Sequence, residues 1–142
     1  MYSNADLNYM QLALDEARKA LWISNPNPRV GCVLVLDDQI IGIGHTQQAG
    51  GPHAEIQALN DAKQRGFNAT GATAYVTLEP CCHHGKTPPC TNALIEHGIS
   101  QVIAAMTDPN PLVAGKGLET LRNNGVQVRC GLLEAEAKEL NP

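Results

Sequence analysis

The segment from Leu78 to Cys90 constrains this chain more than any other stretch. It reads Leu-Glu-Pro-Cys-Cys-His-His-Gly-Lys-Thr-Pro-Pro-Cys and holds three of the five cysteines and two of the five histidines. Its prolines and glycine oppose a regular helix, so these side chains are expected on a loop. A second motif, His53-Ala54-Glu55, stands upstream. One imidazole and two thiolates make a three-ligand zinc site with an open fourth position, which is typical of catalytic zinc. The sequence therefore predicts a metal centre formed by His53, Cys81 and Cys90.

Glu55 follows the predicted ligand His53 by two residues. Residues two apart on a helix do not share a direction, so Glu55 is not expected to be a second ligand. The hypothesis is that Glu55 moves protons, taking one from an attacking water and giving it to departing ammonia. An H-x-E motif followed by P-C-x-x-C is the signature of zinc deaminases. Here eight residues, and not two, separate Cys81 from Cys90.

The alternative is a structural zinc bound within the cysteine-rich loop alone. Its four ligands would be drawn from Cys81, Cys82, His83, His84 and Cys90. That arrangement leaves the His53-Ala54-Glu55 motif without a role, so the catalytic site is favoured.

The remaining cysteines and His97 have simpler interpretations. Cys82 adjoins Cys81 and points elsewhere on an extended chain, which indicates packing. Cys32 lies in an apolar run and is expected in the core. Cys130 is given no role, and His97 is expected to interact with a helix C-terminus.

Composition excludes several classes of protein. The chain has 142 residues, enough for one domain with a real core, and a net charge of −4 without a basic block. Nucleic acid is therefore not expected as a partner. The N-terminus lacks the pattern of a signal peptide, and no apolar run approaches membrane-spanning length. Cysteines clustered around proline and histidine indicate metal binding and not disulfides, so we expect a cytoplasmic protein.

The apolar pattern predicts alternating strands and helices. Strands are expected at 30–36, 40–44, 72–78, 101–105 and 126–129, the first two joined by a turn at 37–39. A first helix capped by Ser3 or Asn4 precedes them, with Leu7, Met10 and Leu14 on its buried face and Leu12 widening it. Further helices are expected from Pro52 to Gly66, after Thr91 as the cap, around 118–124 and at 132–140. The pattern indicates an α/β fold, a three-layer α/β/α domain with a mixed five-stranded sheet.

The predicted elements bring the metal ligands to one place. His53 falls at the start of the second helix, Cys90 at the start of the third, and Cys81 after a strand. Helix N-termini favour thiolates, and open α/β sheets bind ligands beyond the carboxyl ends of their strands.

These motifs resemble a known family. The segment Leu78–Cys90 with His53-Ala54-Glu55 is similar to the deaminase domain of bifunctional riboflavin-biosynthesis proteins, in the cytidine-deaminase-like superfamily. The resemblance runs nearly end to end, because Pro26–Gly31 and Asp108–Gly117 also fit it. The Thr-Pro-Pro-Cys ending and the eight-residue spacing are its specific features.

The resemblance implies one zinc-dependent deaminase domain over residues 1–142. It implies hydrolytic deamination of 2,5-diamino-6-(ribosylamino)pyrimidin-4(3H)-one 5′-phosphate to the corresponding pyrimidinedione, with release of ammonia. The implied zinc ligands are His53, Cys81 and Cys90, the proton shuttle is Glu55, and the substrate-binding residues are Asn27, His83 and Lys86.

The chain departs from the family in two respects. Many members have a histidine seven residues before the zinc histidine, where this chain has Thr46. His45 lies one place earlier, so it is a provisional substrate-binding residue. Bifunctional members also continue into a reductase domain that uses NADPH. We expect either a stand-alone deaminase or a fragment, without reductase activity or a nicotinamide site, and a reductase for the next step.

The sequence leaves other hypotheses about function, phosphate binding and oligomeric state open. The chain could deaminate another base, such as cytosine or guanine, or be a catalytically silent zinc module that binds a nucleotide or a partner subunit. Residues Gly115-Lys116-Gly117 are a candidate for holding the phosphate. A cleft surrounded by loops is commonly completed across a dimer, which leaves a homo-oligomer open.

Overall fold

A computed structural model describes residues 2–20, 28–47, 52–82 and 89–141. The described residues form one mixed sheet of five strands in the order β2-β1-β3-β4-β5, which confirms the predicted fold class. The strands are β1 (Gly31–Leu36), β2 (Gln39–His45), β3 (Thr73–Val76), β4 (Gln101–Ala104) and β5 (Gln127–Cys130). The helices are α1 (Asn4–Arg18), α2 (Ala54–Gln64), α3 (Cys90–Glu96), α4 (Lys116–Asn123) and α5 (Glu134–Leu140).

Strand direction changes in the middle of the sheet. β1 runs antiparallel to both β2 and β3, whereas β3, β4 and β5 are parallel to one another. The predicted hairpin is confirmed, with a two-residue turn at Asp37 and Asp38, whose φ angles are 51° and 61°. Such left-handed pairs match the right-handed twist of the strands on either side. Because β3 and β4 are parallel, their carboxyl ends meet at one edge of the sheet.

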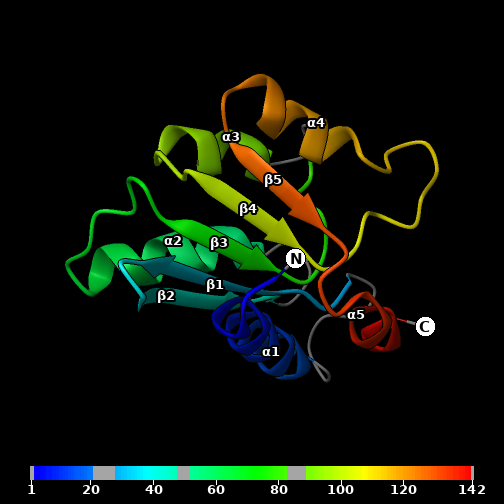
Figure 1. Cartoon of the computed structure of the whole chain (residues 1–142), viewed down its shortest axis with the longest axis horizontal. Coiled ribbons are helices and arrows are strands. Elements are labelled where there is room, and N and C mark those ends of the chain that lie inside the picture. The colour runs from blue at the N-terminus through cyan, green and yellow to red at the C-terminus, as the bar shows by residue number, and fades with distance from the viewer. Residues whose placement is uncertain (1, 21–27, 48–51, 83–88, 142) are drawn as a thin grey trace.

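The helices cover both faces of the sheet, so the molecule has three layers (Figure 1). α1 and α5 pack on one face, where Met10 and Leu14 contact a core that includes Val33, Tyr75 and Ile103. α2, α3 and α4 pack on the other face. Within the described ranges, none of the helices combines the length and the apolar character needed to cross a membrane.

Three local predictions about helix ends and faces have mixed outcomes. Ser3 caps α1 as predicted, in a capping box with Asp6. The buried face of α1 begins at Met10, so Leu7 and Leu12 are 39% and 43% exposed and their predicted burial is wrong. Leu12 lies about 200° around the helix from Met10, which turns it toward solvent. The predicted cap Thr91 is also wrong, because Pro89 occupies the cap position of α3.

Glycines in β2 allow α2 to lie directly on the sheet. A Cβ atom at Gly44 would lie 2.4 Å from the carbonyl oxygen of Ala54, and one at Gly42 would lie 2.3 Å from that of Ala58. Both oxygens belong to backbone that cannot move aside without moving the helix. The first turn of α2 is therefore set by its contact with β2, and this turn carries His53 and Glu55.

Replacing Gly44 by alanine is expected to displace the first turn of α2. Overpacking of this kind costs about 1–3 kcal/mol of unfolding free energy. Urea denaturation of Gly44→Ala measures that loss, and Asn60→Ala, on the exposed side of α2, is the control and should stay within about 0.5 kcal/mol of the parent. Equal stability of the Gly44→Ala variant and the parent would contradict the close approach.

Candidate active site

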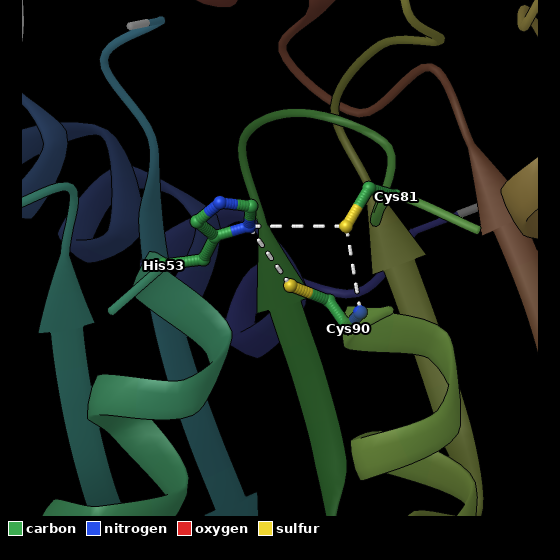
Figure 2. Close-up of side chains that lie close together, drawn as sticks. All are labelled: His53, Cys81 and Cys90. Atoms are coloured by element: carbon green, nitrogen blue, oxygen red, sulfur yellow. Dashed lines mark hydrogen bonds between the residues drawn. The ribbon is translucent and has the colours of Figure 1, made fainter. Parts of the chain in front are cut away.

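Three predicted metal ligands converge at the carboxyl edge of the sheet. His53 is the N-cap of α2, Cys90 is the first residue of α3, and Cys81 lies in the segment that follows β3. Figure 2 shows the three side chains pointing toward one another. The Nδ1 atom of His53 lies 3.1 Å from Sγ of Cys90 and 3.8 Å from Sγ of Cys81. The structure thus brings together residues that are up to 37 positions apart in the sequence.

The donor set fits a single metal ion. The three ligand atoms lie within 4.8 Å of one another. They comprise one imidazole nitrogen and two sulfurs, a combination suited to zinc, and among the described residues they are one fewer than a closed tetrahedral site has. The backbone N–H of Cys90 donates to Sγ of Cys81 over 3.4 Å, which helps to orient that sulfur. Of the local alternative ligands, His83 and His84 lie outside the described residues.

The pKa values of the three clustered side chains are shifted in different directions. Hydrogen bonding from Cys90 lowers the pKa of the Cys81 thiol, and His53 adds to this effect. The same contact with Cys81, together with burial, raises the pKa of the Cys90 thiol. Hydrogen bonding to Cys81 also raises the pKa of His53, although burial opposes the rise. The cluster therefore favours a thiolate at Cys81, and a bound cation would displace the remaining protons.

Glu55 is a buried carboxyl group beside this cluster. Its exposed fraction is only 4%, and it lines the same cavity as His53 and Cys81. Burial raises the pKa of Glu55 to about 7, while its own backbone N–H and the nearby His53 oppose the rise. A carboxyl group with a pKa near neutrality can both accept and release protons under physiological conditions. The position of Glu55 therefore suits a proton carrier.

His53 and Cys81 line a cavity of about 210 Å³. This volume is much larger than the space that one water molecule needs, so the cavity can admit a ligand. Among the described residues its walls include Thr46, Glu79 and Asp108 beside the metal ligands. A smaller cavity adjoins it, and Glu79, Cys81 and Asp108 line both.

The predicted substrate-binding residues are mostly beyond the described part of the chain. Asn27, His83 and Lys86 lie outside the described residues, so their roles stay predictions. Nδ1 of His45 lies 3.0 Å from Oε1 of Glu16, at the end of β2. Thr46, and not His45, is among the described residues that line the cavity.

The hydroxyl group of Thr46 is used by the protein backbone. It donates to the carbonyl oxygen of Pro28 over 3.0 Å and accepts the N–H of Val30 over 2.8 Å. Thr46 is only 6% exposed. The residue therefore holds the segment that follows the predicted substrate residue Asn27, a role that sequence reasoning did not assign.

Sequence reasoning also missed Glu79. This residue is 6% exposed, and its carboxylate accepts the backbone N–H groups of Asp108, Gly115 and Leu118. The one signal in the sequence is that Glu79 directly precedes Pro80-Cys81 and so belongs to the cysteine-rich motif. Because Gly115 and Leu118 donate to Glu79, two N–H groups at the start of α4 are unavailable to a phosphate. Of the candidate phosphate site Gly115-Lys116-Gly117, the N–H of Gly115 is therefore already bound, and the role of this segment stays a prediction.

The other singled-out residues have the simpler roles that were expected. Cys32 is fully buried in the core, and all five cysteines are free. Cys82 and Cys130 are partly buried and lie outside the metal cluster formed by described residues. Nδ1 of His97 lies 2.8 Å from the carbonyl oxygen of Ala93, in the last turn of α3.

Known proteins share both the sequence and the fold. The chain is 53% identical over 141 residues to the riboflavin biosynthesis protein RibD of Aquifex aeolicus, covering 99% of this chain and 39% of that protein. It is 48% identical over 136 residues to a diaminohydroxyphosphoribosylamino-pyrimidine deaminase of Buchnera aphidicola, covering 96% of this chain and 90% of that relative. The solved structure of Acinetobacter baumannii RibD has a TM-score of 0.91 at 51% identity, over 96% of this chain and 38% of that one.

The chain spans less than two fifths of the length of the RibD proteins that it matches. The model of the family described as cytidine and deoxycytidylate deaminase zinc-binding region matches residues 3–106. This range includes all three converging ligands and Glu55. The chain therefore belongs to the cytidine and deoxycytidylate deaminase family.

Proposed function

We propose that the chain catalyses zinc-dependent hydrolytic deamination of 2,5-diamino-6-(ribosylamino)pyrimidin-4(3H)-one 5′-phosphate in riboflavin biosynthesis. The products are 5-amino-6-(ribosylamino)pyrimidine-2,4-dione 5′-phosphate and ammonia. The observation that carries the proposal is the buried Glu55, which lines one cavity with His53 and Cys81, two of the three residues that converge as candidate metal ligands. The named activity of the Buchnera aphidicola relative, which this chain matches over 90% of that protein, supports the choice of substrate.

His53, Cys81 and Cys90 are the proposed zinc ligands. Zinc, when bound, supplies a Lewis acid that makes water acidic enough to be a nucleophile near neutral pH. The helix N-termini that carry His53 and Cys90 favour electron-rich ligands at this position. Cys81 already favours the thiolate, so the proton that a bound cation must displace is mainly that of the Cys90 thiol.

Glu55 is the proposed proton carrier. In the reaction a water oxygen bonds to C2 of the pyrimidine ring, and the bond from C2 to the exocyclic amino nitrogen breaks. The Glu55 carboxylate accepts a proton from the water and delivers it to the amino group, which leaves as ammonia. Its pKa of about 7 allows both transfers without a large energetic penalty. Burial keeps the carboxyl group away from bulk water between the two steps.

Asn27, His83 and Lys86 are proposed to bind the substrate. An amide can pair with the polar edge of a pyrimidinone, and an imidazole with an ammonium group can meet polar or anionic groups. Thr46 supports this arrangement, because it fixes Pro28 and Val30 beside Asn27 in the sequence. His45 is the weaker candidate for a contact, since its ring is paired with Glu16.

The second candidate function is deamination of a cytosine nucleotide. The description of the matching family, which covers cytidine and deoxycytidylate deaminases, favours it. Ammonia release from the diaminopyrimidine ribotide, dCMP, cytidine and guanine, measured side by side, separates the two functions. We expect the ribotide to be preferred.

We further propose that a reductase, in the same or another polypeptide, consumes the product. The Aquifex aeolicus and Escherichia coli relatives are more than twice as long as the region that this chain matches, which leaves room for such a domain. The five free cysteines suit the reducing cytoplasm, which is the proposed location.

Replacing Cys81 by alanine is expected to abolish stoichiometric zinc binding, because two protein ligands hold zinc far less tightly than three. The parent should contain about one zinc ion per chain. Cys82→Ala is the matched control, since Cys82 is adjacent but lies outside the ligand cluster. Elemental analysis of the purified proteins measures the metal. Zinc loss in Cys82→Ala with retention in Cys81→Ala would reverse the proposed assignment.

Replacing Glu55 by glutamine is expected to remove turnover and to leave zinc in place. Loss of a positioned acid–base group lowers the rate by about 10²–10⁴-fold. Ammonia release from the ribotide measures the rate, and Glu96→Gln, an exposed position on α3, is the charge-matched control. Full activity in folded Glu55→Gln would remove this residue from the mechanism.

A further inference from the structure

Glu79 is a buried carboxylate that the proposed reaction does not use. Its Oε1 atom accepts the backbone N–H groups of Asp108 and Gly115, each over 2.9 Å. Its Oε2 atom accepts the N–H of Leu118 over 3.1 Å. Hydrogen bonds to a carboxylate are stronger than those between neutral groups. One side chain therefore fixes both ends of the segment 108–118, which connects β4 to α4.

The carboxylate also replaces a missing helix cap. The N-cap of α4 is Gly115, which has a left-handed φ of 82° and no side chain to accept the first N–H groups. Glu79 supplies the acceptor from 36 residues away in the sequence. Its negative charge is stabilised by the positive end of the helix dipole. The position of α4 thus depends on a residue that belongs to the segment carrying Cys81.

The segment 108–118 packs directly against the segment that carries Cys81. A Cβ atom at Gly117 would lie 2.0 Å from the carbonyl oxygen of Pro80, so no larger residue fits there without movement. The backbone N–H of Glu79 donates to the carbonyl oxygen of Met106 over 3.0 Å, which extends the pairing of β3 with β4. Asp108, whose N–H is bound by Glu79, lines the cavity together with Cys81.

We propose that Glu79 is a positioning residue that locks the segment 108–118 against the Pro80–Cys81 segment and so holds one wall of the substrate cavity. This inference rests on the proposed deaminase function for its kinetic consequence. Glu79 does not touch the reacting atoms in this scheme. It sets the distance between the metal-ligand segment and the cavity wall that includes Asp108.

Glu79→Gln tests the lock with little change of shape. A glutamine oxygen can still accept from Asp108 and Gly115, but its NH₂ group then faces the N–H of Leu118, donor against donor. We expect KM for the ribotide to rise about tenfold, which corresponds to about 1.4 kcal/mol. Zinc content should stay at the parental level and kcat should change much less than KM. Amide hydrogen exchange at residues 108–118 should accelerate.

Asp61→Asn is the matched control, because it also removes a carboxylate that accepts a backbone N–H group. Asp61 accepts the N–H of Ile43 over 2.9 Å and pairs with Arg65, and it is not among the described cavity residues. This control should lower stability while KM and the exchange of residues 108–118 keep their parental values. A purely structural role of Glu79 would give the same result as the control.

Gly117→Ala disturbs the same contact by a change in α4. The new methyl group must push the start of α4 away from Pro80, so KM should rise as it does in Glu79→Gln. Gly125→Ala, at the opposite end of α4, is its control, because both variants add one methyl group to the helix termini. Gly125 has a φ of 83° and nothing within 4 Å of its Cβ, so this control strains the backbone without displacing the wall.

The outcomes separate this inference from the proposed function. Folded, zinc-loaded Glu79→Gln with a parental KM and parental exchange at 108–118 would overturn the positioning role. Failure of the parent to release ammonia from the ribotide would overturn the proposed substrate instead. In that case the exchange comparison of Glu79→Gln with Asp61→Asn still decides whether Glu79 locks the segment.

Discussion

The site depends on two helix N-termini being held against the carboxyl end of one strand. α2 and α3 begin just after and at His53 and Cys90, respectively, and the segment that follows β3 carries Cys81 (Figure 2). Because Gly44 in β2 has no side chain, the start of α2 at Ala54 can lie directly on the strand. This contact fixes the position of His53, the residue before Ala54. The thiolate is favoured at Cys81, because Cys90 and His53 hydrogen-bond to its sulfur.

Two buried glutamates show how surroundings assign different roles to one residue type. Glu55 lies in the cavity beside sulfur ligands, and burial brings its pKa near neutrality. Glu79 has both carboxylate oxygens occupied by backbone N–H groups of a single segment. The first arrangement suits proton transfer and the second suits fixing of the backbone. We therefore propose that Glu55 transfers protons and that Glu79 fixes the backbone around the site.

Local patterns predicted most of the fold and the core of the site. Ser3 could be recognised as a cap from its own neighbours, and the convergence of His53, Cys81 and Cys90 from a motif whose spacing has a chemical reason. Contacts between residues far apart in the sequence could not be predicted from it. Glu79 binds N–H groups about 30 to 40 residues away, and Thr46 binds backbone 16 to 18 residues away, so neither role leaves a local pattern.

The most direct test of the account is the coordination of zinc in the parent protein, measured by X-ray absorption at the zinc edge. We expect about one zinc ion per chain with two sulfur neighbours and lighter atoms in the remaining positions. Two sulfurs correspond to Cys81 and Cys90, and the lighter atoms to His53 and an exchangeable ligand. Three or four sulfur neighbours, or protein purified without chelators that binds no zinc, would contradict the central claim.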